Sequence, residues 1–255
     1  MLDRAREIYR QSKKRNDNFW TEWISRPPAA LVVQALGPTP VTPNQVTFMS
    51  LAVFAAGAAV LVGWTTWLGL ITSVLLMQVS YVLDCADGQL ARYKSMASPV
   101  GALLDFLMDE IKAFLLVGAA AARQAIVTGD SRWLFAGIAG VVVAATGIAL
   151  TTFMRRPEYL AAVGAPALAP ATDRGGHAPR SLSPVALVEA AGRYVMHYPS
   201  YLVVIALVNR LDIFLYAYLA AHFLYLGRSS LIVLLKLGRP QRRPAITPAA
   251  SDQTP

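Results

Sequence analysis

Residues 84–110 read DCADGQLARYKSMASPVGALLDFLMDE, and this stretch places four aspartates inside two apolar segments. Asp84 and Asp87 stand near the end of one segment at spacing i, i+3, and Asp105 and Asp109 stand in the next at spacing i, i+4. Either spacing puts both side chains of a pair on one face of a helix. The connection between the segments is short, which makes the two helices antiparallel neighbours. The sequence therefore predicts that the four aspartates converge on one point.

The surrounding sequence has the composition of a membrane protein. Apolar residues make up 55% of the 255 residues and charged residues only 15%, whereas a soluble domain carries roughly 25% charge. The mean hydropathy is +0.45. The sequence thus predicts an all-α, polytopic membrane fold with six transmembrane helices, the fifth of which is short. The six runs are roughly 44–63, 66–90, 99–122, 132–154, 199–209 and 211–236.

The part of the chain before the first span carries an aromatic face. Phe19, Trp20, Trp23 and Ile24 share this face, which favours an N-terminal interfacial amphipathic helix on the membrane surface over residues 17–36. An ordinary amphipathic helix packed on protein is the alternative. We expect three parts: a cytoplasmic basic arm with the interfacial helix (1–36), the six-helix transmembrane domain (37–238) and a disordered cytoplasmic tail (239–255). Between the fourth and fifth spans we expect a polar stretch (155–183) and a short amphipathic helix (184–198).

The basic residues sort to one side of the predicted spans. The net charge is +8, and most Lys and Arg fall in the arm, after the second and fourth spans and in the tail. The connection 123–132 and the junction before the sixth span hold only Arg123, Arg132 and Arg210. The positive-inside rule then places both termini in the cytoplasm, in the cell (inner) membrane. Nucleic acid is not an expected partner, because no basic stripe alternates with exposed aromatic residues.

The four aspartates predict a bound cation. A carboxylate inside a span costs about 2.5–3.5 kcal/mol on an insertion scale, and clustered carboxylates repel one another, so protons or cations must compensate them. Oxygen-only ligands favour a hard dication such as Mg²⁺, Mn²⁺ or Ca²⁺, and zinc is disfavoured because no His or Cys pair stands at ligand spacing. The alternative is a set of pore-lining or salt-bridged acids.

Small residues and one arginine complete the pattern. Gly88 and Ala91 continue the face of the first aspartate pair, Gly101 precedes Asp105 by one turn, and Arg92 can form a forked contact with a phosphate. The stretch resembles the signature of class I of the CDP-alcohol phosphotransferase (phosphatidyltransferase) family, D-x2-D-G-x2-A-R-x8-G-x3-D-x3-D, with every fixed position present. The six-span layout and the sequence TPNQVT at 42–47 extend the resemblance to most of the chain.

The resemblance implies a metal-dependent transferase that moves a phosphate-linked group from a CDP-activated donor to an alcohol and releases CMP. It implies that Asp109 is the general base and that two ions, Mg²⁺ or Mn²⁺, are bound. The implied metal ligands are Asp84, Asp87, Asp105 and Asp109, and the implied donor-binding residues are Asn44, Gln45, Gly88, Ala91, Arg92 and Ser98. Alternatively, Ser98 is only a helix cap and Asn44 only a turn residue.

The acceptor is left open. Many family members carry Arg after the fourth aspartate, but this chain has Glu110, and Lys112 can face the site instead. A phosphorylated acceptor, such as inositol phosphate or glycerol phosphate, would need a cationic pocket. The candidates for it are Lys112, Arg155, Arg156, Arg174 and Arg210.

The favoured interpretation is phosphatidyl transfer from CDP-diacylglycerol to a polar alcohol in phospholipid biosynthesis, in contact with membrane lipids. The resemblance to the family also implies a homodimer. One alternative is transfer from a soluble CDP-alcohol to a lipid hydroxyl. A divalent-cation transporter and a non-catalytic scaffold are alternatives of other classes.

Overall fold

The computed structural model describes residues 7–10, 19–164, 194–195 and 197–237. Every regular element in these residues is a helix, which confirms the all-α prediction. The elements are the π-helical turn η1 (Thr21–Ser25) and the helices α2 (Arg26–Leu36), α3 (Pro43–Gly63), α4 (Trp67–Tyr93), α5 (Pro99–Thr128), α6 (Arg132–Met154), α7 (Pro157–Ala162), α9 (Pro199–Leu207) and α10 (Leu211–Leu237).

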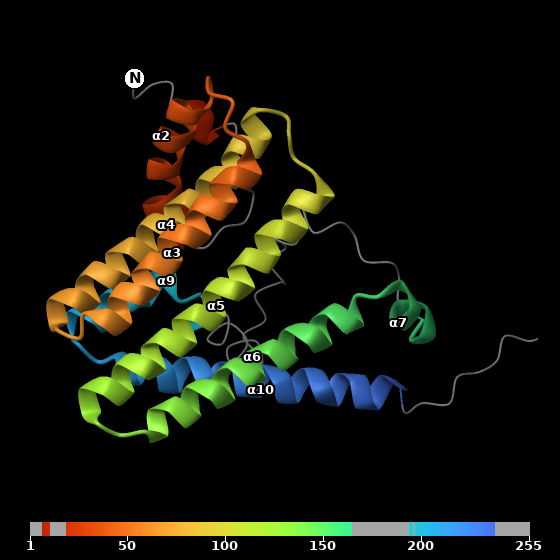
Figure 1. Cartoon of the computed structure of the whole chain (residues 1–255). Coiled ribbons are helices and arrows are strands. Elements are labelled where there is room, and N and C mark those ends of the chain that lie inside the picture. Colours follow the sequence, from red (N-terminus) through yellow and green to blue (C-terminus); the bar gives the residue numbers. More distant parts are fainter. Residues whose placement is uncertain (1–6, 11–18, 165–193, 196, 238–255) are drawn as a thin grey trace, which may run out of the picture.

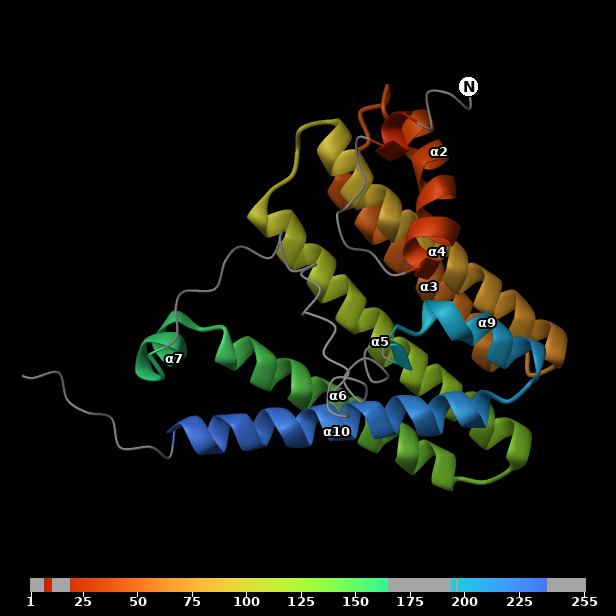
Figure 2. The ribbon, with the colours of Figure 1, turned by 180° about the vertical axis from the view of Figure 1, so that it is seen from behind.

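Two groups of long helices make up the molecule (Figure 1). Helices α3, α4 and α5 run side by side, and α6 and α10 form a second pair that diverges from them. Figure 2 shows the molecule from behind, with α6 and α10 as a pair and α9 beside the turn between α3 and α4. The larger buried core lies where the groups meet, and it includes Phe54, Met77, Leu116 and Phe214. The end of the bundle where α4 leads into α5 carries the aspartates.

Four of these helices, α3, α4, α6 and α10, are long and apolar enough to cross a membrane. Helix α5 has 30 residues, which corresponds to about 45 Å, but it carries five charged residues. Helix α9 has only nine residues, or about 14 Å, which is less than the roughly 30 Å of a bilayer core. The count of six spans therefore stays a prediction. The polar stretch and amphipathic helix predicted before α9, and the predicted tail, fall largely outside the described residues.

Local side-chain contacts set the start of the helices that carry the site. Thr42 and Gln45 form a reciprocal capping box at the start of α3, with hydrogen bonds of 2.8 and 3.3 Å. Ser98 accepts a 3.0 Å hydrogen bond from the amide of Gly101 and so caps α5. Lys94 follows α4 and donates to the carbonyls of Thr39 and Val41, which ties the end of α4 to the chain entering α3. These contacts hold three helix ends together beside the aspartates.

Arg123 does not lie in a connection, as the sequence suggested, but inside α5. Its side chain is buried, and it donates to the carbonyls of Leu61, Trp64, Thr65 and Thr66 at 2.7–3.2 Å. The last carbonyls of a helix have no intrahelical partner, so a cation that reaches them from a neighbouring helix caps that end. Arg123 is therefore a structural residue that fixes the turn between α3 and α4 against α5.

The N-terminal segment combines a packed face with an exposed aromatic face. On α2, Ala29 and Val33 are buried against α4, as expected for a helix packed on protein. Phe19, Trp23 and Ile24 lie before α2 and are exposed. An apolar face that is exposed in this way fits the interfacial prediction, which itself stays a prediction.

Candidate active site

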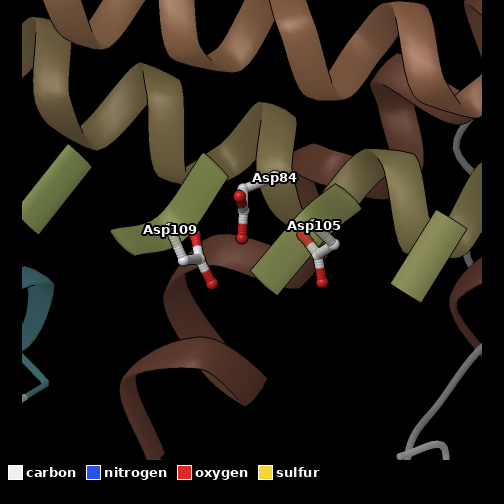
Figure 3. Close-up of side chains that lie close together, drawn as sticks. All are labelled: Asp84, Asp105 and Asp109. Atoms are coloured by element: carbon white, nitrogen blue, oxygen red, sulfur yellow. The ribbon is translucent and has the colours of Figure 1, made fainter. Parts of the chain in front are cut away.

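Three of the four aspartates come together. Asp84 on α4 and Asp105 and Asp109 on α5 each offer a carboxylate oxygen, and these oxygens all lie within 4.8 Å of one another. Figure 3 shows the Asp84 side chain reaching from α4 into the space between Asp105 and Asp109. The i, i+4 spacing puts Asp105 and Asp109 on one face of α5. Helices α4 and α5 both pack on α3 rather than closely on one another as the sequence had suggested, and the aspartates meet in the space between them.

Asp87 does not join this group of three carboxylates, although the sequence predicted that all four aspartates converge on one point. Its side chain is 5% exposed, and its Oδ2 accepts a 2.6 Å hydrogen bond from the hydroxyl of Thr47 on α3. It still lies within electrostatic reach of Asp84 and Asp105. Sequence reasoning missed Thr47, because a threonine inside an apolar helix gives no local signal of a partner on another helix.

Lys112 faces the site, as the sequence allowed. Its ammonium contacts Oδ1 of Asp84 and lies 3.2 Å from Oδ1 of Asp109. The Lys112 side chain is only 2% exposed, whereas that of Asp109 is 55% exposed. Lys112 thus belongs to the carboxylate group rather than to an open acceptor pocket.

The donor set fits a hard divalent metal ion. Three carboxylates within 4.8 Å of one another supply only oxygen ligands, which Mg²⁺ and Mn²⁺ prefer over the His and Cys ligands of zinc. Close like charges in a membrane protein also need a compensating cation. The residues present therefore fit the metal that the sequence implied.

Residues from α3 and α5 meet next to the carboxylates. A methyl group added at Gly101 would lie 3.2 Å from Oγ of Ser98 and 3.5 Å from Oδ1 of Asn44. Asn44 is exposed at the start of α3 and Ser98 at the start of α5. The structure thus brings three of the predicted residues to one place, where the missing side chain of Gly101 leaves room.

On α4, the remaining donor-binding candidates lie one to two turns beyond Asp84. A methyl group at Gly88 would lie 3.7 Å from Nη1 of Arg92, so the guanidinium folds back along the helix over Gly88. Arg92 is exposed, and Ala91 is half-buried. Gln45 is engaged in the capping box of α3, which gives it a structural role that the sequence pattern did not reveal.

Arg155 lines a small cavity between α5, α6 and α10. The cavity has a volume of about 140 Å³, and its polar lining includes Glu110, Thr151, His222 and Tyr225. The Arg155 guanidinium lies 5.3 Å from the centre of the Phe106 ring on α5. Arg155 therefore lies beside the helix that carries Asp105 and Asp109.

The other predicted arginines are not gathered at the carboxylates. Arg156 is exposed beyond the end of α6, and Arg174 lies outside the described residues. Arg210 precedes α10 and forms a 2.8 Å ion pair with Asp212. Asp212 lines a cavity together with Arg123, and Arg123 is 14 residues, or about 21 Å, along α5 from Asp109. Arg210 therefore belongs to the opposite end of the bundle.

A polar network next to the site was missed entirely by sequence reasoning. The hydroxyl of Tyr81, one turn before Asp84, lies 2.8 Å from Nε2 of His197 and 2.6 Å from the hydroxyl of Thr21. Burial lowers the pKa of His197, so the ring stays neutral near pH 7. Only the i, i+3 spacing of Tyr81 and Asp84 is visible in the sequence, because Thr21 and His197 lie 60 and 116 positions from Tyr81 in the chain.

Comparison with known proteins agrees with the motif and the geometry. The CDP-alcohol phosphatidyltransferase family profile matches residues 40–208, which is more than half of the chain. The bifunctional IPC transferase and DIPP synthase of Rubrobacter xylanophilus is 38% identical over 71 residues, which cover 28% of this chain and 15% of that protein. The chain thus matches only a small part of this relative.

Proposed function

Because the chain is an integral membrane protein that belongs to the CDP-alcohol phosphatidyltransferase family, we propose that it transfers a phosphatidyl group from CDP-diacylglycerol to a polar alcohol and releases CMP. The observation that carries the proposal is the convergence of Asp84, Asp105 and Asp109 from two apolar helices within 4.8 Å. Such a group needs compensating positive charge in a membrane protein, and Lys112 supplies only one such charge to the three carboxylates.

In the proposed site, Asp84, Asp105 and Asp109 would hold the metal. Asp87 would add a further carboxylate, which the hydroxyl of Thr47 on α3 holds in place. A bound dication supplies charge neutralisation for the donor's pyrophosphate. Gly88, Ala91 and Arg92 contact the CDP group, with Asn44 and Ser98 beside it, and Gln45 supports Asn44 by holding the start of α3.

Asp109 accepts the proton of the acceptor hydroxyl in this proposal. Its carboxylate is the open one, 55% exposed against 14% for Asp84, so an alcohol can reach it. The alcohol oxygen attacks the β-phosphorus, the bond between that phosphorus and the bridging oxygen breaks, and CMP leaves with the bonding electrons.

The acceptor binds, in this proposal, on the Arg155 side of α5. Arg155 and Glu110 share the cavity of about 140 Å³, and their opposite charges suit a small polar acceptor rather than an apolar one. Arg156 and Arg174 remain candidates for a phosphate on the acceptor, whereas Arg210, at the other end of the bundle, is left out. The Rubrobacter relative is named as an IPC transferase, which supports a transferase function.

A donor assay tests the proposal. Purified protein in lipid nanodiscs is incubated with Mn²⁺ or Mg²⁺ and a panel of polar alcohols, and CMP release is followed with CDP-diacylglycerol and, separately, with soluble CDP-alcohols plus diacylglycerol. We expect CMP only with CDP-diacylglycerol and none after chelation with EDTA. Turnover with the soluble donors alone would reverse the roles of donor and lipid. Uptake of Mn²⁺ into liposomes without any CMP release would favour the transporter.

A further inference from the structure

The cavity beside Arg155 is lined by hydroxyl groups whose hydrogens are bonded within the protein. The Thr151 hydroxyl donates its hydrogen to the carbonyl of Gly147 at 2.8 Å, because a carbonyl can only accept. The hydroxyls of Thr151 and Tyr225 lie 3.2 Å apart, so Tyr225 donates its single hydrogen to Thr151. The Tyr225 oxygen is therefore left as an acceptor.

His222 on α10 is left with an acceptor in the same way. Its Nδ1 lies 2.9 Å from the carbonyl oxygen of Tyr218, so Nδ1 carries a hydrogen and donates it. In a neutral imidazole the other nitrogen, Nε2, then carries no hydrogen and accepts. The charged form of the ring is disfavoured in an apolar helix such as α10. Within the described part of the chain, Nε2 of His222 has no hydrogen-bond partner.

Two charged side chains complete the polar lining of the cavity. The carboxyl group of Glu110 on α5 offers oxygen acceptors, whereas the Arg155 guanidinium only donates. The two groups lie within electrostatic reach of one another. The cavity therefore offers acceptors from three side chains and donors from one. A ligand that fits it must bring several donors together with at least one acceptor.

A molecule with several hydroxyl groups meets this requirement. Each hydroxyl both donates and accepts, so such a molecule can donate to His222 and Tyr225 while it accepts from Arg155. A monohydric alcohol uses its one hydroxyl for the reaction at Asp109 and leaves the acceptors of the cavity unpaired, which is costly away from water. An amino alcohol brings an ammonium, which the guanidinium repels.

We propose that His222 is a specificity-determining residue, whose Nε2 accepts a hydrogen bond from an acceptor hydroxyl other than the one that attacks phosphorus. The inference rests on the proposed function and narrows its polar alcohol to a polyhydric one. The cavity is suitably placed, because Glu110 directly follows Asp109 on α5 and Phe106 precedes it by about one turn. A molecule in the cavity thus lies beside the proposed base.

Pairs of acceptors that differ by one hydroxyl test this inference. Full-length protein in nanodiscs with Mn²⁺ and CDP-diacylglycerol receives glycerol phosphate or the analogue without its middle hydroxyl, inositol phosphate or its monodeoxy analogues, and ethanolamine or serine. CMP release gives kcat/KM for each acceptor. We expect the fully hydroxylated member of a pair to be preferred about tenfold. In His222→Phe, which keeps a ring next to Tyr218, the ratio should fall towards one.

Further substitutions separate recognition from structure. His222→Gln loses the bond to the Tyr218 carbonyl as His222→Phe does, but it carries an oxygen acceptor and should restore part of the preference. Tyr225→Phe removes the other uncharged acceptor and should lower the ratio even if His222→Phe does not fold. Tyr216→Phe removes the hydroxyl of an exposed tyrosine elsewhere on α10 and should keep the ratio of the unaltered protein.

The outcomes separate this inference from the proposed function. Equal kcat/KM values within every pair, or a preference for ethanolamine or serine, would overturn the inference, while the CMP released would still support the proposed function. An unchanged ratio in both His222→Phe and Tyr225→Phe would remove these side chains from acceptor recognition. Without CMP release from any acceptor, the proposed function and the inference that rests on it both fail.

Discussion

At the scale of single residues, the proposed division of labour among the aspartates can be separated by substitution. Asp109→Asn keeps the shape of the side chain but removes the base, so we expect turnover to fall by about 10²–10⁴-fold. Binding of CDP-diacylglycerol, measured by titration without acceptor, should remain, because Asp84, Asp87 and Asp105 are intact. Asp130→Asn, in the exposed turn after α5, is the matched control. Near-normal CMP release from Asp109→Asn would remove the residue from the role of base.

The hydrogen bond between Thr47 and Asp87 gives a second residue-scale prediction. Both side chains are buried, and Thr47→Val removes the hydroxyl without changing the shape, so Asp87 loses a donor, which costs about 1–3 kcal/mol. We expect a lower thermal midpoint in detergent and weaker Mn²⁺ binding. Thr47→Ser keeps the hydroxyl and should behave like the unaltered protein. If Thr47→Val and Thr47→Ser gave equal midpoints and Mn²⁺ affinities, the contact would have no role in shaping the site.

These residues also mark how far the sequence could predict the site. Asp84, Asp105 and Asp109 were found because helical spacing and a short connection are local properties that bring them to one side. The partners of Asp87 and Tyr81 could not be found in this way, because Thr47 and His197 belong to other segments of the chain that pack against α4. Nothing in one helix's periodicity specifies which polar group a neighbouring helix presents.

At the scale of elements, the capping role of Arg123 is open to a stability test. Arg123→Met removes four hydrogen bonds to the end of α3 and the following turn, so we expect a loss on the order of 3 kcal/mol of stability. A thermal midpoint in detergent measures it. Because Arg123 lies about 21 Å along α5 from Asp109, CMP release per folded molecule should hardly change. Arg132→Met, an exposed arginine at the start of α6, should leave the midpoint unchanged.

Element boundaries were predictable where the sequence contains a helix-start or turn signal. The first and fourth spans were expected at 44–63 and 132–154 and are found at Pro43–Gly63 and Arg132–Met154, because Pro43 and the turn before Arg132 mark their starts. The fifth apolar run was expected at 199–209, and α9 covers Pro199–Leu207. Its nine residues are shorter than a bilayer core requires, so a fifth crossing of the membrane stays a prediction.

At the scale of the whole molecule, the structure sharpens the argument for orientation. Three basic residues were counted from the sequence on the side opposite the termini. Of these, Arg123 is buried as a cap and Arg210 is paired with Asp212, which leaves Arg132. The opposite end keeps Arg92, Lys94, Arg155 and Arg156, together with the carboxylates. The positive-inside bias therefore predicts that the site opens to the cytoplasm, where a polar acceptor is available.

Cysteine labelling in intact cells tests that orientation. In a Cys85→Ala background, Met96→Cys lies in the exposed connection between α4 and α5, and Ser131→Cys lies in the exposed turn between α5 and α6. Because α5 separates these positions, they should lie on opposite membrane faces. A membrane-impermeant maleimide should label Ser131→Cys in intact cells and Met96→Cys only after permeabilisation. The reverse pattern would place the carboxylates outside the cell. Labelling of both without permeabilisation would mean that α5 does not cross the membrane, and the acceptor could then not be assigned to the cytoplasm from charge alone.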